Sequence, residues 1–146
     1  MRCHLEWSVK LSLLMYVTSA PGGRLEVDGV TSERGTFRFP LEEVGADGSL
    51  RFGGSVAFFA HHGAFITTLS HLQLTPGALG WAVSYTPPGA DGPIVAWRTG
   101  APAPEAAGVT ELPVVALTEG GAAAFGGYYA AGEAFDPMRV VGAPPL

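Results

Sequence analysis

The chain reads LRFGGSVAFFAHHGAFITTLSHLQL from Leu50 to Leu74, a pattern typical of two strands joined by a tight turn. From Leu50 to Ala60, apolar residues alternate with small or polar ones, as they do on the two faces of a β-strand. A second strand is expected from Ala64 to about Leu74, antiparallel to the first. The segment His61-His62-Gly63 then forms the tip of a hairpin, which places histidines at the rim of a sheet.

Shorter strands are predicted on both sides of this hairpin, each bounded by Gly or Pro. Alternation of apolar and polar residues supports them. They cover Arg24–Val27, Thr36–Phe39, Leu79–Tyr85, Ile94–Arg98, Leu112–Leu117 and Met138–Val141. About eight antiparallel strands at this spacing indicate a mainly β domain, built as a sandwich or a barrel.

Two helices are expected beside the strands. An amphipathic helix is predicted from Leu5 to Val17, because the side chains of one helical face recur there, with Tyr16 on that face near the C-terminal end. The face comprises Leu5, Val9, Ser12, Leu13 and Tyr16. A short second helix is predicted from Thr118 to Phe125, with Thr118 as its N-cap.

The composition is that of one folded domain covering residues 1–146. Hydrophobic residues make up 47% and charged residues 14%, against roughly 25% charged in ordinary domains. Such a chain has ample material for an apolar core or an apolar ligand site. The 21 glycines and 12 prolines predict many turns.

The charge balance excludes nucleic acid as a partner. The chain has 8 basic and 13 acidic residues, and Lys10 is its one lysine, whereas nucleic-acid binders cluster Lys and Arg. Cys3 is the single cysteine, so no disulfide within the chain and no multi-cysteine metal site is expected.

The apolar run from Leu11 to Val17 is too short to span a membrane. Because Glu6 and Lys10 interrupt the segment before it, a signal peptide cleaved after Ala20 is not predicted. We therefore expect a cytoplasmic protein as the sequence is written, or an extracellular or cell-surface one if the chain is a mature fragment.

The residues alone favour no catalytic group. Gly53–Ala57 lacks the closing glycine of a nucleophile elbow, and Glu42 and Glu43 are expected to be solvated loop carboxylates. His61 and His62 are adjacent, a spacing that disfavours a shared zinc ion. From the residues alone, each histidine is interpreted as an exposed turn residue. Tyr16 is interpreted as a core or capping tyrosine.

Several segments, in order along nearly the whole chain, resemble motifs of one family. Trp7–Val17 reads WSVKLSLLMYV and is similar to Trp-Gly-Val-Lys-x-Ser-Phe-x-x-Tyr-Val. Thr36–Pro40 is similar to Phe-x-Phe-Pro, and Phe52–Phe65 to Gly-Ser-Val-x-Phe-x-Gly-His-x-Gly-x-Leu. Later segments are similar to Leu-Thr-x-x-Gly, Ala-Phe and Tyr-x-x-Gly-x-x-Leu-Asp-Pro, namely Leu117–Gly120, Ala124–Gly127 and Tyr129–Pro137. These are motifs of the HtaA-domain family of bacterial haem-uptake proteins.

The resemblance implies a β-rich domain that binds one haem b, with Tyr16 as the iron ligand and His61 hydrogen-bonded to the phenol oxygen. Tyr129 matches a late tyrosine associated with the haem pocket, and Phe58 would supply an apolar wall. His62 falls at a variable position. Four departures concern the shape of the pocket, since the family has Gly, Phe, Gly and Leu at the positions of Ser8, Leu13, Ala60 and Phe65.

The family's role is haem acquisition and transfer. The expected partners are haem and another haem-carrier protein, and the question of a homodimer is left open. The alternative is a stand-alone haem-dependent enzyme, in which His62 or His71 would be the distal acid–base group. A third class is an interaction domain that has lost haem.

Tyrosinate ligation agrees with elementary chemistry. A phenol with a pKa of about 10 binds metal when a ferric ion favours its deprotonated form, and a hydrogen bond from His61 would stabilise that anion further. An anionic oxygen ligand prefers Fe(III) to Fe(II). Such a site suits capture and transfer of oxidised haem.

Overall fold

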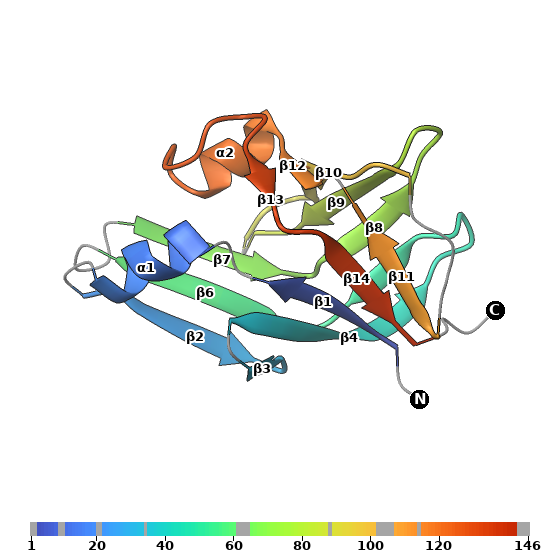
Figure 1. Ribbon diagram of the computed structural model, residues 1–146, viewed down its shortest axis with the longest axis horizontal. Coiled ribbons are helices and arrows are strands. Elements are labelled where there is room, and N and C mark those ends of the chain that lie inside the picture. The colour runs from blue at the N-terminus through green and yellow to red at the C-terminus, as the bar shows by residue number, and fades with distance from the viewer. Residues whose placement is uncertain are drawn as a thin grey trace.

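The computed structural model describes residues 3–8, 11–19, 22–33, 35–60, 65–87, 89–101, 107–113 and 115–142. Two helices and fourteen strands lie in this part of the chain (Figure 1). The helices are α1 (Leu11–Ser19) and α2 (Glu119–Ala124). The strands are β1 (His4–Ser8), β2 (Arg24–Asp28), β3 (Thr31–Glu33), β4 (Thr36–Val44), β5 (Leu50–Phe52), β6 (Ser55–Ala60), β7 (Phe65–Ser70), β8 (Gln73–Pro76), β9 (Trp81–Tyr85), β10 (Ile94–Arg98), β11 (Val109–Leu112), β12 (Val115–Leu117), β13 (Ala134–Phe135) and β14 (Met138–Val141).

The strands form a large curled sheet and a small one, which confirms the prediction of a mainly β, antiparallel fold. The curled sheet has the order β11-β14-β1-β4-β5-β8-β9-β10-β12-β13, with β3 also on β4, and the small sheet is β2-β6-β7. Strand β4 pairs with β1 along its first half and with β5 along its second half, where the register shifts between Leu41 and Glu43. Such a bulge bends a strand and increases its twist, so β4 is where the large sheet turns.

The opening segment of the chain differs from the expected structure. A helix starting at Leu5 is not supported, because His4–Ser8 is strand β1 and α1 begins at Leu11. Leu5 and Trp7 are buried between polar neighbours, which is the two-residue period of a strand. Pairing with both β4 and β14 holds β1 inside the sheet.

The predicted strand from Leu50 to Ala60 is in fact two strands in different sheets. Strand β5 belongs to the curled sheet and β6 to the small one. The chain breaks at Gly54, which has a φ of +86° and where a Cβ would lie 2.4 Å from Cγ2 of Val30. Only glycine fits this close, left-handed turn.

The returning strand is also divided. Its first part, β7, pairs antiparallel with β6 from Ala60 opposite Phe65 to Ser55 opposite Ser70, which confirms the hairpin. The expected tip, His61-His62-Gly63, and the expected first residue of the second strand, Ala64, lie outside the described residues. His71, with a φ of 53°, then separates β7 from β8. The predicted strand Leu112–Leu117 corresponds to β12, while Leu112 is the last residue of β11. Strands β1, β3 and β13 lie where the sequence pattern predicts no strand.

The short second helix is confirmed as α2. The Thr118 hydroxyl accepts a hydrogen bond from the Gly121 backbone N–H at 3.0 Å, as an N-cap does. Gly121 is buried, and a Cβ there would lie 2.2 Å from the Ala96 carbonyl oxygen. This glycine therefore allows α2 to pack directly on β10.

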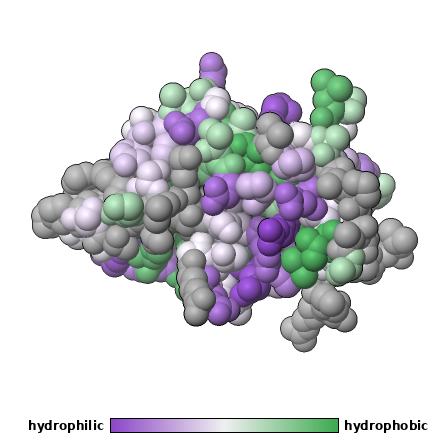
Figure 2. All heavy atoms as spheres, in the orientation of Figure 1, coloured by the Kyte–Doolittle hydropathy of each residue, from purple (hydrophilic) through white to green (hydrophobic). Residues whose placement is uncertain are grey.

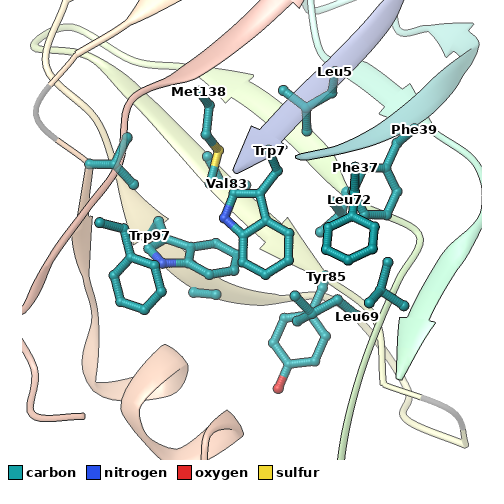
Figure 3. Close-up of a cluster of buried hydrophobic side chains, with 14 of the residues drawn as sticks. Leu5, Trp7, Phe37, Phe39, Leu69, Leu72, Val83, Tyr85, Trp97 and Met138 are labelled. Carbon is teal, nitrogen blue, oxygen red and sulfur yellow. The ribbon is translucent and has the colours of Figure 1, made fainter. Parts of the chain in front are cut away.

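The core contains a group of aromatic rings between the two sheets (Figure 3). Trp7 lies at its centre, with ring centroids 6.0 Å from Phe37, 6.1 Å from Phe58 and 5.6 Å from Trp97. Trp97 continues the group to Phe125, at 6.0 Å. Since Trp7 comes from the curled sheet and Phe58 from the small one, this group joins the two sheets.

The outer face of the curled sheet carries a row of alternating charges. Glu6 receives a hydrogen bond from Arg38 at 3.0 Å and lies opposite Arg139 on β14. The row ends at Glu33, 3.8 Å from Arg38, and at Glu111, 3.8 Å from Arg139. Figure 2 shows the hydrophilic band over β1, β4 and β14. Opposite charges on neighbouring strands favour this register.

Candidate functional site

Helix α1 lies against β2 and β6 at one end of the small sheet (Figure 1). Leu13 and Val17 form its buried face, while Ser12 and Met15 are exposed. The chain that leaves α1 enters β2, whose first residue, Arg24, pairs with Phe59 near the end of β6. The C-terminal end of α1 and the end of β6 are therefore at the same end of the molecule.

Of the two residues expected at the iron, the structure describes only the backbone of Tyr16. Tyr16 belongs to α1, in the turn after Ser12, and its side chain lies outside what the structure describes. His61 and His62 follow Ala60, the last residue of β6, and also lie outside the described residues. The assignment of Tyr16 and His61 therefore stays a prediction.

Tyr129 is fixed to α1 by a direct hydrogen bond. Its hydroxyl lies 2.7 Å from the Ser12 hydroxyl, and the side chain is 6% exposed. Its ring contacts Phe125, Phe135 and Tyr128, with centroids 5.9, 5.2 and 4.8 Å away. The segment after α2 is thus joined to the helix that carries Tyr16.

From the sequence alone, Ser12 has no assigned role in the haem site. Its partner is 117 positions away in the chain, so no local pattern could indicate this contact. One signal was present, because Ser12 precedes Tyr16 by four residues and positions i and i+4 share a helix face.

Phe58 lies in the core. It is fully buried, and its ring is 6.4 Å from that of Phe125, which in turn contacts Tyr129. The Thr67 hydroxyl on β7 donates a hydrogen bond to the Ala124 carbonyl at the end of α2. These contacts connect the β6–β7 hairpin to the segment that carries Tyr129, while a role of Phe58 as a pocket wall stays a prediction.

Burial raises the pKa of the Tyr129 hydroxyl above its ordinary value of 10.0, and the Ser12 hydrogen bond offsets part of that rise. Nearby Tyr128 and Glu133 raise the pKa further. Tyr129 is therefore a neutral hydroxyl at physiological pH, able both to donate and to accept a hydrogen bond.

We expect stability to fall above about pH 10 and Tyr129→Phe to remove part of that fall. With a folded-state pKa above 10.0, the unfolded phenol loses its proton first as pH rises, so stability that is complete below pH 10 decreases through the folded-state pKa. Part of the fall should persist in the variant, because burial also raises the pKa of Tyr85. Urea unfolding of the variant and the parent from about pH 8 to about pH 11 would measure this.

An identical alkaline fall in Tyr129→Phe and the parent would contradict a buried, neutral Tyr129. Below about pH 10, loss of the bond to Ser12 should also lower stability by about 0.5–1.5 kcal/mol.

No group of three or more His, Cys, Asp and Glu side chains able to hold a metal ion occurs in the described part of the chain. His71 is exposed beside β8, where it lines a cleft with Glu42, Glu43 and Arg51. Cys3 is a buried free thiol whose pKa is raised by burial.

The model of the HtaA family matches residues 2–141. This chain belongs to the HtaA family. The match includes the α1 motif with Tyr16, the β6–β7 hairpin and the segment with Tyr129. No curated protein matches the chain.

Solved structures of proteins from Corynebacterium glutamicum share the fold. The C-terminal domain of HtaA has a TM-score of 0.77 and 21% identity, over 96% of this chain and 94% of that one. The N-terminal domain of HtaA has a TM-score of 0.74 and 25% identity, over 99% and 98%. The heme binding protein HtaB has a TM-score of 0.69 and 16% identity, over 96% and 92%.

In the part of the chain that the structure describes, no helix is long and apolar enough to cross a membrane.

Proposed function

We propose that this chain binds one haem b through the phenolate of Tyr16, for haem acquisition, carriage or transfer to another haem carrier. The observation that carries the proposal is the family match over residues 2–141, which includes both the tyrosine and histidine motifs. The relative HtaB, which shares the fold, is itself a heme binding protein.

The arrangement of the described elements supports this assignment. Because Arg24 pairs with Phe59, the C-terminal end of α1 and the end of β6 lie at the same end of the small sheet. Tyr129 adds a buried hydroxyl, hydrogen-bonded to the helix of Tyr16. The rings of Phe125 and Phe135 pack against Tyr129 and give its ring an apolar environment.

The donor set fits ferric haem. Haem supplies a Lewis-acidic Fe(III) when bound, and tyrosinate is a known axial ligand for it. His61 would act as a positioning residue that donates a hydrogen bond to the phenolate oxygen and stabilises the anion. Tyr129, kept neutral by burial, bonds to Ser12 and would hold α1 in place.

Haem titration tests the proposal directly. Purified chain should bind ferric haem to saturation at one equivalent, with the charge-transfer absorption of tyrosinate ligation. Protein that stays colourless with haem supplied would instead identify an interaction domain without haem. Transfer of the bound haem to an apo-acceptor supports carriage, while retained haem with peroxide turnover would support the enzyme alternative.

We also expect haem affinity to fall on reduction. Reduction to Fe(II) removes one positive charge from the metal and weakens its attraction to an anionic phenolate. Parallel titrations with ferric haem and, under anaerobic dithionite, ferrous haem would measure the difference. Equal affinities for both forms would contradict tyrosinate ligation.

A further inference from the structure

The interior of the curled sheet is not filled at one end. Inward-facing side chains of five strands, β5, β8, β9, β11 and β14, leave a partly open cavity of about 140 Å³ there. It is lined by Leu50, Leu74, Trp81, Thr110, Leu112 and Val140. Figure 1 shows β8 and β11 on the side of the molecule opposite α1. The cavity shares no residue with the candidate haem site.

The register of the sheet explains why the cavity is apolar. Leu50 lies directly opposite Leu74 in one wall, and Thr110 lies directly opposite Val140 in another. Since alternate residues of a strand face the same side, Leu112 points inward with Thr110. The half-buried Trp81 stands at the edge of the opening.

The size and lining of the cavity specify a ligand class. An aliphatic cavity of roughly 150 Å³ stays dry and binds benzene, and the mouths of β-barrels are common sites for small ligands. No charged side chain lines this cavity, so an ionic ligand would lose its hydration without compensation. The occupant should therefore be neutral and about the size of one six-membered ring.

Thr110 adds one polar contact. Its hydroxyl is the one hydroxyl in the lining. We propose that this mouth of the curled sheet is a second ligand site, which takes a neutral, benzene-sized molecule bearing a single hydroxyl, with phenol as the simplest representative. The Thr110 hydroxyl can donate to or accept from that group.

Methyl NMR of the full chain with phenol and with benzene tests the site. Both probes should shift the Leu50, Leu74, Leu112 and Val140 methyl resonances saturably, with dissociation constants on the order of 1 mM and tighter binding of phenol. Ring-to-methyl NOEs should place the probe in the cavity. Absence of saturable shifts at these methyls, or NOEs to other residues, would overturn the proposal.

Two substitutions on β11 distinguish an effect inside the cavity from an effect on the opposite face of the strand. Thr110→Phe should fill the cavity and abolish binding of both probes, while Val109→Phe, which adds the same ring on the other face, should leave binding unchanged. Unchanged phenol binding in folded Thr110→Phe would overturn the site.

An isosteric change tests the hydroxyl without altering the volume. Thr110→Val should weaken phenol roughly threefold to tenfold through loss of one hydrogen bond, and leave benzene unaffected. Thr31→Val, at an exposed position on β3, is the matched control. Equal phenol affinity in Thr110→Val and the parent would overturn the proposed preference for a hydroxyl.

Discussion

Replacing Tyr16 by Phe is expected to abolish haem binding and to leave the fold intact. The substitution removes the phenol oxygen proposed to bind the iron and keeps the aromatic ring. Because haem then lacks its axial ligand, the tyrosinate charge-transfer absorption should disappear together with the affinity. Absorbance titration with ferric haem, alongside circular dichroism of the same sample, measures both effects.

The neighbouring histidines should respond differently. His61→Ala removes a hydrogen bond of roughly 1–3 kcal/mol to the ligand oxygen, so haem should still bind, about tenfold to a hundredfold more weakly. The charge-transfer band should also shift, because the phenolate becomes more basic. His62→Ala, at the variable position, is the matched control and should have little effect.

These variants also distinguish tyrosine from histidine as the ligand. If Tyr16→Phe binds haem like the parent while His61→Ala or His62→Ala abolishes binding, a histidine holds the iron and the proposed assignment is wrong.

Replacing Trp97 by Ala is expected to be the most damaging of the proposed substitutions for stability. Trp97 is 1% exposed, and its ring lies between those of Trp7, Phe125 and Phe135. Loss of the indole leaves a cavity at the junction of the curled sheet and α2, which should lower the free energy of unfolding by about 3–5 kcal/mol. Urea unfolding of the haem-free chain measures this change.

Trp97→Phe should cost much less, about 1–2 kcal/mol, because two effects oppose each other. The smaller ring loses apolar contact. It also removes the indole Nε1–H, which is buried without a hydrogen-bond partner in the described part of the chain. Leu79→Ala, at a 91% exposed position, is the surface control and should change stability little. Equal losses in Trp97→Phe and Trp97→Ala would contradict this account.

Much of the β-structure could be predicted because its determinants are local. In the β6–β7 hairpin, Val56, Phe58 and Leu69 are buried at the alternating positions that the sequence indicates. The cap of α2 is equally local, since Thr118 bonds the backbone only three residues ahead.

The wrong boundaries share one physical cause. Over the few residues of His4–Ser8, the apolar pattern is compatible with both a helix and a strand. Pairing with β4 and β14, which are distant in the chain, makes this segment a strand. At Gly54 the alternation of apolar residues continues without interruption, yet contact with Val30 turns the chain into another sheet. Neither partner can be identified from the local pattern.

The sequence by itself determined most of the strand-forming segments and the family motifs, because each depends on residue type and spacing along the chain. The choice of Tyr16, His61 and Tyr129 is what the resemblance to the family implies. The tertiary structure alone decided which segments meet. The bond between Ser12 and Tyr129 and the cavity at the mouth of the curled sheet join residues far apart in sequence. Such contacts depend on strand order and register, which many distant side chains settle together through packing.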